Sequence, residues 1–211
     1  MPGKRKYELR KRAEQLEETR RRITEATVEL HRTIGPAATQ ISEIARRAGV
    51  QRVTVYNHFP DETALFAACS AHWRGLHPTP DSAAWLEISD PGERLRLGLR
   101  ELYGWYRETE PMTANILRDA ETVAAMRPFV EQGLGGYLGA VRRVLGEPIR
   151  VTVRGRRRAR VDAALRAAVD FHVWRLLAPL GDTDAADLAA GLVELAATGR
   201  TASVARPVAY G

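Results

Sequence analysis

The chain has 211 residues, of which 45% are hydrophobic and 27% charged, a composition typical of a folded globular protein and not of a disordered one. No apolar run approaches the roughly 20 residues that a transmembrane helix needs, and no apolar segment follows the basic N-terminus as in a secretory signal. Cys69 is the only cysteine, which excludes an intramolecular disulfide framework, so we expect a cytoplasmic protein.

The net charge of +6 is concentrated at one end of the chain. Residues 1–60 contain 13 Lys and Arg against 7 Asp and Glu, whereas residues 61–211 contain 19 of each. A basic segment joined to a neutral body favours phosphate binding by one domain and a separate task for the other. A solvated arginine-rich surface is the alternative. Residues 1–15 are interpreted as a flexible basic arm that binds DNA, or as a disordered solubilising tail.

Residues 16–77 have the pattern of a small helical domain. Apolar residues at helical spacing predict a first helix from about residue 20 to Gly35 and a second over 41–48. Gly49 follows the second helix, where a left-handed turn residue is needed. Asp61 is predicted to cap a further helix that ends near residue 76.

Between these helices lies the segment QRVTVYNH, residues 51–58. Its alternation of apolar and polar residues and its β-branched side chains resemble a short edge strand. Its position between Gly49 and Pro60 favours instead a helix of about two turns, with Val55 and Phe59 facing inward. We therefore predict a helix here.

The two prolines of residues 77–82 mark a predicted domain boundary, and residues 78–211 are interpreted as helical. The expected elements are a short turn at 82–88 and helices at about 91–109, 111–123, 127–145, 159–177 and 182–198. The stretch 149–153 (IRVTV) forms either a short strand or, as we favour, part of a basic loop over 146–158. The fold class is therefore all-α, with about nine helices.

Three residues meet the demands of a helix-turn-helix. Such a motif needs a small residue where the helices cross, a turn residue that accepts positive φ, and an inward aliphatic residue on the second helix. Ala45, Gly49 and Val55 satisfy these demands at offsets of four and six residues. Side chains at the start of the second helix would then meet base edges in the major groove of DNA.

The motif elements resemble the DNA-binding module of the TetR family of bacterial transcriptional regulators. The matching elements are Ile44-Ala45, Ala48-Gly49-Val50, Tyr56-Asn57-His58-Phe59 and Ala64-Leu65-Phe66. The resemblance covers about residues 16–75. It implies an N-terminal three-helix helix-turn-helix DNA-binding domain (16–77) and a C-terminal helical ligand-binding and dimerisation domain (78–211), with no cofactor or metal.

The resemblance also implies DNA contacts by position. The residues are Arg20, Arg21, Thr39, Ser42, Gln51, Arg52, Val53, Thr54, Tyr56, Asn57 and His58. This chain departs from the family pattern at two positions. Where the family has a capping Thr or Ser, the chain has Thr39-Gln40, so either Thr39 caps one residue early or that phosphate contact is lost. Glu62 stands where the family often has a phosphate-binding lysine.

A palindromic operator requires a two-fold dimer, because one module spans a half-site. The last two predicted helices carry apolar faces suited to a four-helix bundle between chains. The candidate interface residues are Val161, Leu165, Ala168, Val169, Leu176, Leu188, Leu192 and Leu195. An intramolecular core is the alternative for the same residues.

A regulator also needs an input, and the helices after residue 91 are rich in aromatic residues. The candidate effector pocket consists of Tyr103, Tyr106, Met112, Asn115, Ile116, Asp119, Phe129, Tyr137, His172 and Trp174. Apolar walls with a few polar groups suit a small apolar or amphipathic molecule. Ordinary core packing is the alternative for each aromatic residue. The glycines of residues 131–140 either allow close helix crossings or loosen a helix.

The predicted function is a repressor that binds a palindromic DNA operator as a homodimer and is released by a small-molecule effector. The alternative is a sequence-tolerant DNA-binding protein without an effector. An enzyme is not expected, because no catalytic triad order, glycine-rich phosphate loop or metal-ligand spacing of the histidines is found. Redox sensing by Cys69 is disfavoured, because this residue falls on the predicted inward side of its helix.

Overall fold

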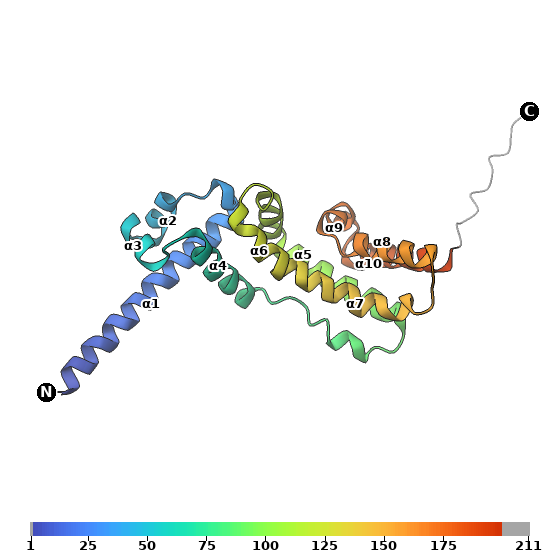
Figure 1. Cartoon of the computed structure of the whole chain (residues 1–211), viewed down its shortest axis with the longest axis horizontal. Coiled ribbons are helices and arrows are strands. Elements are labelled where there is room, and N and C mark those ends of the chain that lie inside the picture. Colours follow the sequence, from blue (N-terminus) through green and yellow to red (C-terminus); the bar gives the residue numbers. More distant parts are fainter. Residues whose placement is uncertain (1, 200–211) are drawn as a thin grey trace, which may run out of the picture. The chain divides into compact units, whose positions relative to one another are not determined.

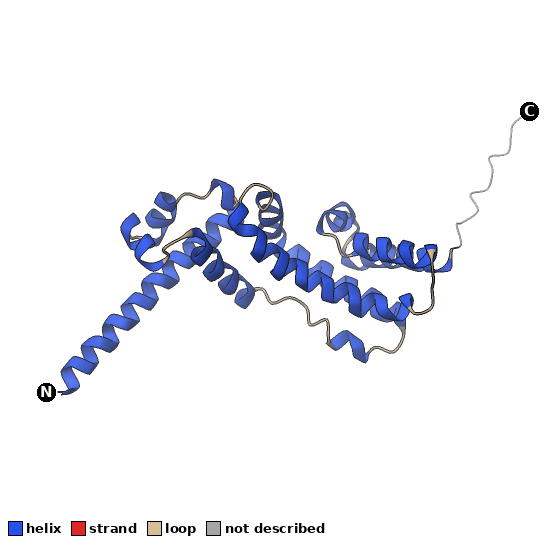
Figure 2. Cartoon of the chain, viewed as in Figure 1, coloured by secondary structure: helices blue, strands red, loops and turns tan. Residues whose placement is uncertain are grey.

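A computed structural model describes residues 2–199, and side chains from residue 7 onward. These residues form helices and loops without a strand (Figure 2), which confirms the all-α fold class. The α-helices are α1 (Pro2–Thr33), α2 (Ile41–Ala48), α3 (Arg52–His58), α4 (Glu62–Leu76), α5 (Pro91–Asp119), α6 (Arg127–Phe129), α7 (Gly136–Arg150), α8 (Arg156–Ala168), α9 (Phe171–Leu177) and α10 (Asp182–Thr198). Short 3-10 turns lie at Pro36–Ala38, Ala84–Glu87, Ala124–Met126 and Ala178–Leu180.

The chain divides into two compact units. The first unit contains residues 1–79 and 108–137, and the second contains residues 80–107 and 138–211. Helix α5 contributes its first part to the second unit and its last part to the first. The first unit therefore includes a segment that follows the expected boundary near residue 77.

The first unit is built around the inward faces of α1 to α4. Its buried core comprises Ile23, Val28, Leu30, Ile44, Ala45, Ala48, Val55, Phe59, Leu65 and Cys69, together with Met112 from α5. The predicted apolar spacing of the first four helices is thereby confirmed. In Figure 1, α2 and α3 lie side by side, and the first half of α1 projects away from them.

Helix α1 begins at Pro2, well before the predicted start near residue 20. Residues 2–15, for which we expected a flexible arm, are helical in the structure. The cause is local: residues 4–20 contain no proline or glycine and many good helix formers, and Arg10 pairs with Glu14 at 2.8 Å. The side chains of Lys4, Arg5 and Lys6 lie outside the described residues.

Two predicted helix boundaries after residue 91 are wrong. Pro111 was expected to start a new helix, but it lies inside α5. The proline ring is exposed, while Thr109 and Met112 of the same helix are buried, and burial of these neighbours opposes the cost of about 3 kcal/mol that a proline carries inside a helix. The predicted helix 159–177 is two helices, because the chain leaves helical geometry at Val169 and Asp170 caps α9 through its own side chain.

The predicted helix 127–145 is also interrupted. Residues Val130–Gly135 form a π-helical segment between α6 and α7. An added Cβ at Gly133 or Gly136 would meet nothing within 4 Å, so these glycines do not serve a close helix crossing. These glycines therefore fit the second interpretation, in which they loosen the helix. Residues 149 and 150 end α7 and residues 151–155 form a turn, so the favoured loop holds only in part and no strand forms there.

The second unit packs α8 against α10 through small residues. Ala185, Ala189 and Val193 of α10 are buried, as are Val161 and Leu165 of α8. Helix α10 begins at Asp182 directly after Gly181, and no side chain caps its first turn. The fold thus leaves the other side of α10 exposed.

Candidate nucleic-acid interface

The turn between α2 and α3 depends on one glycine. Gly49 has φ 65° and ψ 39°, a left-handed conformation that costs residues with a Cβ about 1 kcal/mol. The Val50 N–H donates to the Ala45 carbonyl at 2.9 Å and the Gly49 N–H to the Arg46 carbonyl at 3.3 Å. This pair of bonds closes α2 as a Schellman motif and turns the chain into α3, as predicted.

Helix α3 has one buried and one exposed side. Val55 is fully buried, and Phe59 just after the helix is 2% exposed. The predicted contact residues lie on the other side: Gln51, Arg52, Val53, Tyr56 and Asn57 are exposed, and Thr54 and His58 are half-buried. This side offers a cation, amides, hydroxyls and a methyl-bearing side chain, the groups that can contact base edges in a major groove. No acidic residue occurs in α3.

The two arginines predicted to contact DNA from α1 have partners within the first unit. Arg20 Nη1 donates to the His58 carbonyl at 2.8 Å, and its guanidinium lies 4.3 Å from the centre of the Phe59 ring. Arg20 therefore closes the end of α3 and fixes it to α1. Arg21 forms ion pairs with Glu18 and Glu25 at 2.7 and 2.6 Å, which raises its pKa further above the usual range.

The start of α2 differs from the predicted cap. The Thr39 hydroxyl donates to the Gly35 carbonyl at 2.8 Å, and the residue before the helix is Gln40, which makes no side-chain cap. Early capping by Thr39 is therefore wrong. Ser42 is exposed in the first turn of α2. The predicted cap of α4 is confirmed, because Asp61 accepts a hydrogen bond from the Ala64 N–H at 2.7 Å.

Two residues that were assigned to the effector pocket hold the end of α1. Asn115 Nδ2 donates to the carbonyls of His31 and Arg32 at 3.0 and 2.9 Å, and Asp119 Oδ2 accepts from the Ala37 N–H at 2.9 Å. The Asn115 bonds satisfy carbonyls that the end of α1 leaves open, and the Asp119 bond satisfies a backbone N–H at the start of the turn Pro36–Ala38. They fix the last residues of α5 to the segment that connects α1 to α2.

His31 is buried beside this connection and lies 5.5 Å from the Phe66 ring. Burial lowers the pKa of His31 to about 4, although the charge of Asp119 partly opposes the shift. Burial alone would raise the pKa of Asp119, but hydrogen bonds from Arg118 and the Ala37 N–H, with nearby positive charge, lower it overall. His31 is therefore neutral at pH 7, and its protonation carries a desolvation cost that Asp119 offsets only in part.

Cys69 faces the core of the first unit. Its side chain is 5% exposed, and burial raises the pKa of the thiol to about 12. A thiol that remains protonated at neutral pH is a poor nucleophile. The structure thus supports the expectation of a buried, unreactive cysteine.

The candidate effector residues are divided between the units. Met112, Asn115, Ile116, Asp119, Phe129 and Tyr137 belong to the first unit, and Tyr103, Tyr106, His172 and Trp174 belong to the second. Met112 and Ile116 pack on the core of the first unit. His172 is exposed.

The two buried tyrosines of α5 act on the break between α8 and α9. The hydroxyl of Tyr103 donates to the Ala168 carbonyl at 2.7 Å, and that of Tyr106 donates to the Val169 carbonyl at 2.7 Å. These groups are therefore committed to the backbone of the second unit. Trp174 is 1% exposed, yet its Nε1 has no hydrogen-bond partner among the described residues.

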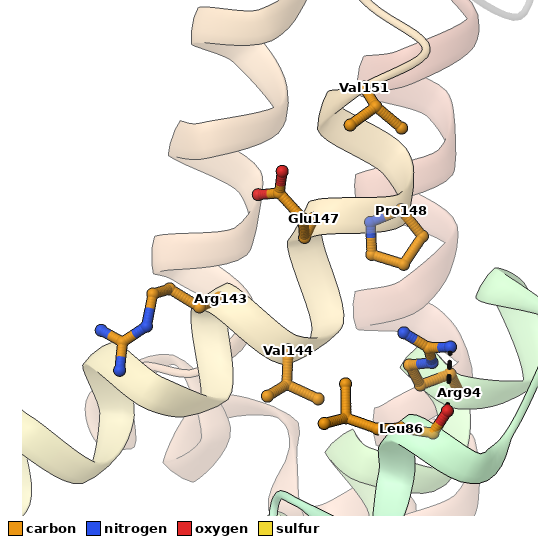
Figure 3. A pocket seen from close by; sticks show the side chains of 7 residues that line it. All are labelled: Leu86, Arg94, Arg143, Val144, Glu147, Pro148 and Val151. Carbon is orange, nitrogen blue, oxygen red and sulfur yellow. Dashed lines mark hydrogen bonds between the residues drawn. The ribbon is translucent and has the colours of Figure 1, made fainter.

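The second unit also has an open surface pocket of about 390 Å³ that the sequence did not indicate. It is lined by Leu86, Arg94, Arg143, Val144, Glu147, Pro148 and Val151. Leu86 and Val144 point toward one another there, and Arg94 is held by the Leu86 carbonyl at 3.4 Å (Figure 3). The apolar residues of the IRVTV segment were the sequence feature that could have indicated this pocket. The pocket was not predicted, because neither the end of the helix at residue 150 nor the turn over 151–155 was predicted.

The predicted dimer residues fall into two groups. Val161, Leu165, Ala168 and Val169 are at most 1% exposed, so these four belong to the core of the second unit and are removed from the candidate interface. Leu188, Leu192 and Leu195 lie at i, i+4 and i+7 on α10 and are 55, 49 and 44% exposed. Leu176 on α9 is also exposed. We call the three exposed leucines of α10 the leucine stripe.

Within the described residues, no group of three or more His, Cys, Asp and Glu side chains is placed to hold a metal ion. None of the helices between residues 2 and 199 has the length and hydropathy needed to cross a membrane.

Comparison with known proteins supports the assignment of the first unit. Residues 23–69 match the family described as bacterial regulatory proteins, tetR family. The HTH-type transcriptional regulator AcrR of Shigella flexneri is 38% identical over 58 residues, which is 28% of this chain and 27% of that protein. The regulator SrpR of Pseudomonas putida is 40% identical over 75 residues, or 34% and 35% of the two chains. The matches thus span about a third or less of these relatives.

Two solved structures have a similar fold over most of the chain. A candidate fatty acid metabolism regulator of Clostridium perfringens has a TM-score of 0.61 at 16% identity, covering 86% of this chain and all of that one. The transcriptional regulator FadR of Bacillus subtilis, in complex with stearoyl-CoA, has a TM-score of 0.58 at 20% identity, covering 85% and 98%. At these identities the likeness concerns the fold alone.

Proposed function

We propose that this chain, whose N-terminal region is a TetR-family DNA-binding domain, is a cytoplasmic transcriptional repressor that binds a palindromic operator as a homodimer. The observation that carries the proposal is the exposed side of α3. Arg52, Val53 and Asn57 are exposed there, while Val55 holds the helix from behind. These are the groups with which a recognition helix contacts base edges.

The leucine stripe supports the dimer. Aliphatic side chains in regular helical spacing that are half exposed leave apolar area in water, and a second copy of the same stripe would cover it. The two-fold symmetry of such a contact matches the symmetry of a palindromic DNA site. The two protomers would then place their α3 helices in two successive major grooves, one helix in each groove.

Release by a small molecule would proceed through a shift between two dimer conformations. An effector that binds one conformation more tightly lowers operator affinity by the difference in its binding free energy for the two. Asn115 and Asp119 support a route for this change through α5. Their side chains bind backbone atoms at the end of α1 and in the segment that connects α1 to α2. Trp174 Nε1 is a buried donor without a partner among residues 2–199, and we propose that a polar atom of a largely apolar effector accepts its hydrogen bond.

The decisive experiment is selection of binding sites from random duplex DNA by the full chain. We expect enrichment of an inverted repeat whose half-sites are about one helical turn apart, bound by two protomers in sedimentation analysis. The matched control is the same duplex with one half-site scrambled, which should bind at least about tenfold more weakly. Equal affinity for all duplexes would contradict the proposal and favour the sequence-tolerant alternative.

The effector is tested separately by thermal unfolding with a panel of small amphipathic compounds. A true effector should raise the melting temperature and release the operator at the same concentration. Trp174→Phe keeps the aromatic packing and removes the donor, so it should weaken that response and leave operator binding by the free protein unchanged. If no compound in a broad panel shifts melting, the effector part of the proposal fails.

A further inference from the structure

The first half of α1 is a helix that the domain core does not use. Every residue from Tyr7 to Glu18 is exposed, whereas burial in α1 begins only at Ile23. In Figure 1 this half of the helix extends away from α2, α3 and α4. A regular helix of this length that packs on nothing in its own unit is unusual, because most helical stability comes from packing of an apolar face.

The charge of this segment is asymmetric. Residues 4–12 contain six cations and one acid, and the cations are Lys4, Arg5, Lys6, Arg10, Lys11 and Arg12. Three acids follow at Glu14, Glu17 and Glu18, of which Glu14 pairs with Arg10 and Glu18 with Arg21. Lys11 and Arg12 have no ion pair among the described residues. The positive charge is therefore greatest at the distal end of the helix.

The position of the segment is set by α3. The bond from Arg20 to the His58 carbonyl joins α1 to the last residue of the proposed recognition helix. Residues before Arg20 therefore leave the domain beside the end of α3. From Lys4 to Arg20 a helix spans about 24 Å at 1.5 Å per residue, the length of about seven base pairs at 3.4 Å each.

We propose that residues 4–12 form a rigid helical arm that binds backbone phosphates of the DNA flanking each half-site. The inference rests on the proposed function, since it needs an operator bound by α3. Long cationic side chains on several sides of a helix suit contact with phosphates, which fixes position and adds affinity without reading sequence. Leu9 and Leu16 are the only large aliphatic residues between Tyr7 and Glu18, too few for a helix that binds a lipid surface.

The arm predicts that affinity depends on the length of flanking DNA. The full chain is titrated against operator duplexes that end about two or about ten base pairs beyond each half-site. The wild type should bind the longer duplex at least about tenfold more tightly. Lys11→Gln with Arg12→Gln should remove most of this difference and, over the two arms of a dimer, lower the slope of log affinity against log salt by about 3 to 4.

Two further variants make the test specific. Arg158→Gln with Arg160→Gln removes the same charge from exposed positions of α8 in the second unit, and it should keep the flank dependence. Ala13→Pro keeps every charge but interrupts the helix at its exposed part, and it should reduce the advantage of the longer duplex. If Ala13→Pro behaves as the wild type, the arm is not a rigid helix and the proposal is wrong.

The outcomes separate this inference from the proposed function. Absence of sequence-specific binding by every variant would overturn the proposed function. Specific binding that is insensitive to flank length and to the Lys11 and Arg12 substitutions would overturn the arm alone. Loss of binding to anionic phospholipid vesicles in the double variant, with DNA affinity unchanged, would also overturn it in favour of a lipid partner.

Discussion

Helices α3 and α10 both expose aliphatic side chains, but the side chains that surround them differ. On α3, Val53 is 57% exposed and stands between Arg52 and Thr54. On α10, Leu188, Leu192 and Leu195 form a stripe in helical spacing, and the acids beside it, Asp187 and Glu194, are paired with Arg96. A lone apolar group among donors and acceptors suits the mixed surface of a DNA groove, whereas a stripe suits another apolar surface. Exposure alone does not define a partner; the neighbouring side chains do.

The largest predicted effect follows from breaking the stripe. Leu192→Glu places a charge at its centre, and we expect a monomer in sedimentation analysis. Operator affinity should fall at least about 100-fold, because each half-site is then bound without the effective concentration that a linked second site provides. Leu86→Glu, at an exposed leucine of the second unit outside the stripe, is the control and should remain dimeric. A dimeric Leu192→Glu variant would remove α10 from the interface.

The second prediction extends the comparison to pH, because His31 lies in the unit that contains α3. Its pKa falls from 6.5 in the unfolded chain to about 4 in the folded one. The contribution of neutral His31 to the free energy of unfolding is therefore fully present above pH 6.5 and is lost as the pH falls toward 4. Over this range we expect a loss of up to about 3 kcal/mol in the free energy of unfolding of the first unit. Urea titrations from pH 7 to 4 measure it.

His31→Leu is the matched control, because leucine is apolar and cannot be protonated. The variant should lose much less stability over the same pH range, leaving only the contribution of carboxylates. Asp119→Asn should steepen the loss, since it removes the charge that partly offsets the protonated imidazole. Parallel curves for wild type and His31→Leu would contradict the role of His31.

The third prediction concerns α3 itself. Arg52→Ala should weaken operator binding by about 1–3 kcal/mol and relax the preference at one base pair, without changing the dimer mass. The control is Arg46→Ala, an exposed arginine of α2 that is paired with Glu43 at 2.6 Å. Binding assays on all single-base operator variants distinguish the two. Equal losses at every base pair would make Arg52 a phosphate contact.

The smallest effect is expected at Val53. Val53→Ala removes two methyl groups from the exposed side of α3 and should cost about 1 kcal/mol at one base pair. Replacement of thymine by uracil at that position should produce a loss of similar size in the wild type and none in the variant. A stability change without an affinity change would show that Val53 does not face a thymine methyl group.

The sequence predicted α2, α3 and α4 of the first unit closely, because these elements depend on local signals, whereas the start of α1 and the part contributed by α5 were not predicted. Gly49 in the left-handed turn, Asp61 as a cap and Val55 as an inward residue are each set by neighbours within a few positions. The roles of Arg20 and Asn115 were not predicted. Their partners lie 38 and 84 residues away in the sequence, as His58 and His31, and no local pattern indicates such pairs.

After residue 91 the sequence indicated helices but not their ends. Helix α5 continues through Pro111, and the helix predicted over 159–177 breaks at Val169, where the Tyr106 hydroxyl from a distant part of the sequence binds the Val169 carbonyl. Apolar spacing marked Leu165 and Leu192 equally as interface residues. Burial separates them, because α8 packs against one side of α10 only.

The buried thiol of Cys69 can report when the core of the first unit opens. A thiol with a pKa of about 12 in the core of the first unit reacts with an alkylating reagent only when that core opens. Since no other cysteine is present, the labelling rate follows the opening of the first unit alone, in the intact protein and without an added probe. A slower labelling rate of the Cys69 thiol in the presence of an operator duplex would measure the free energy by which DNA binding stabilises this core.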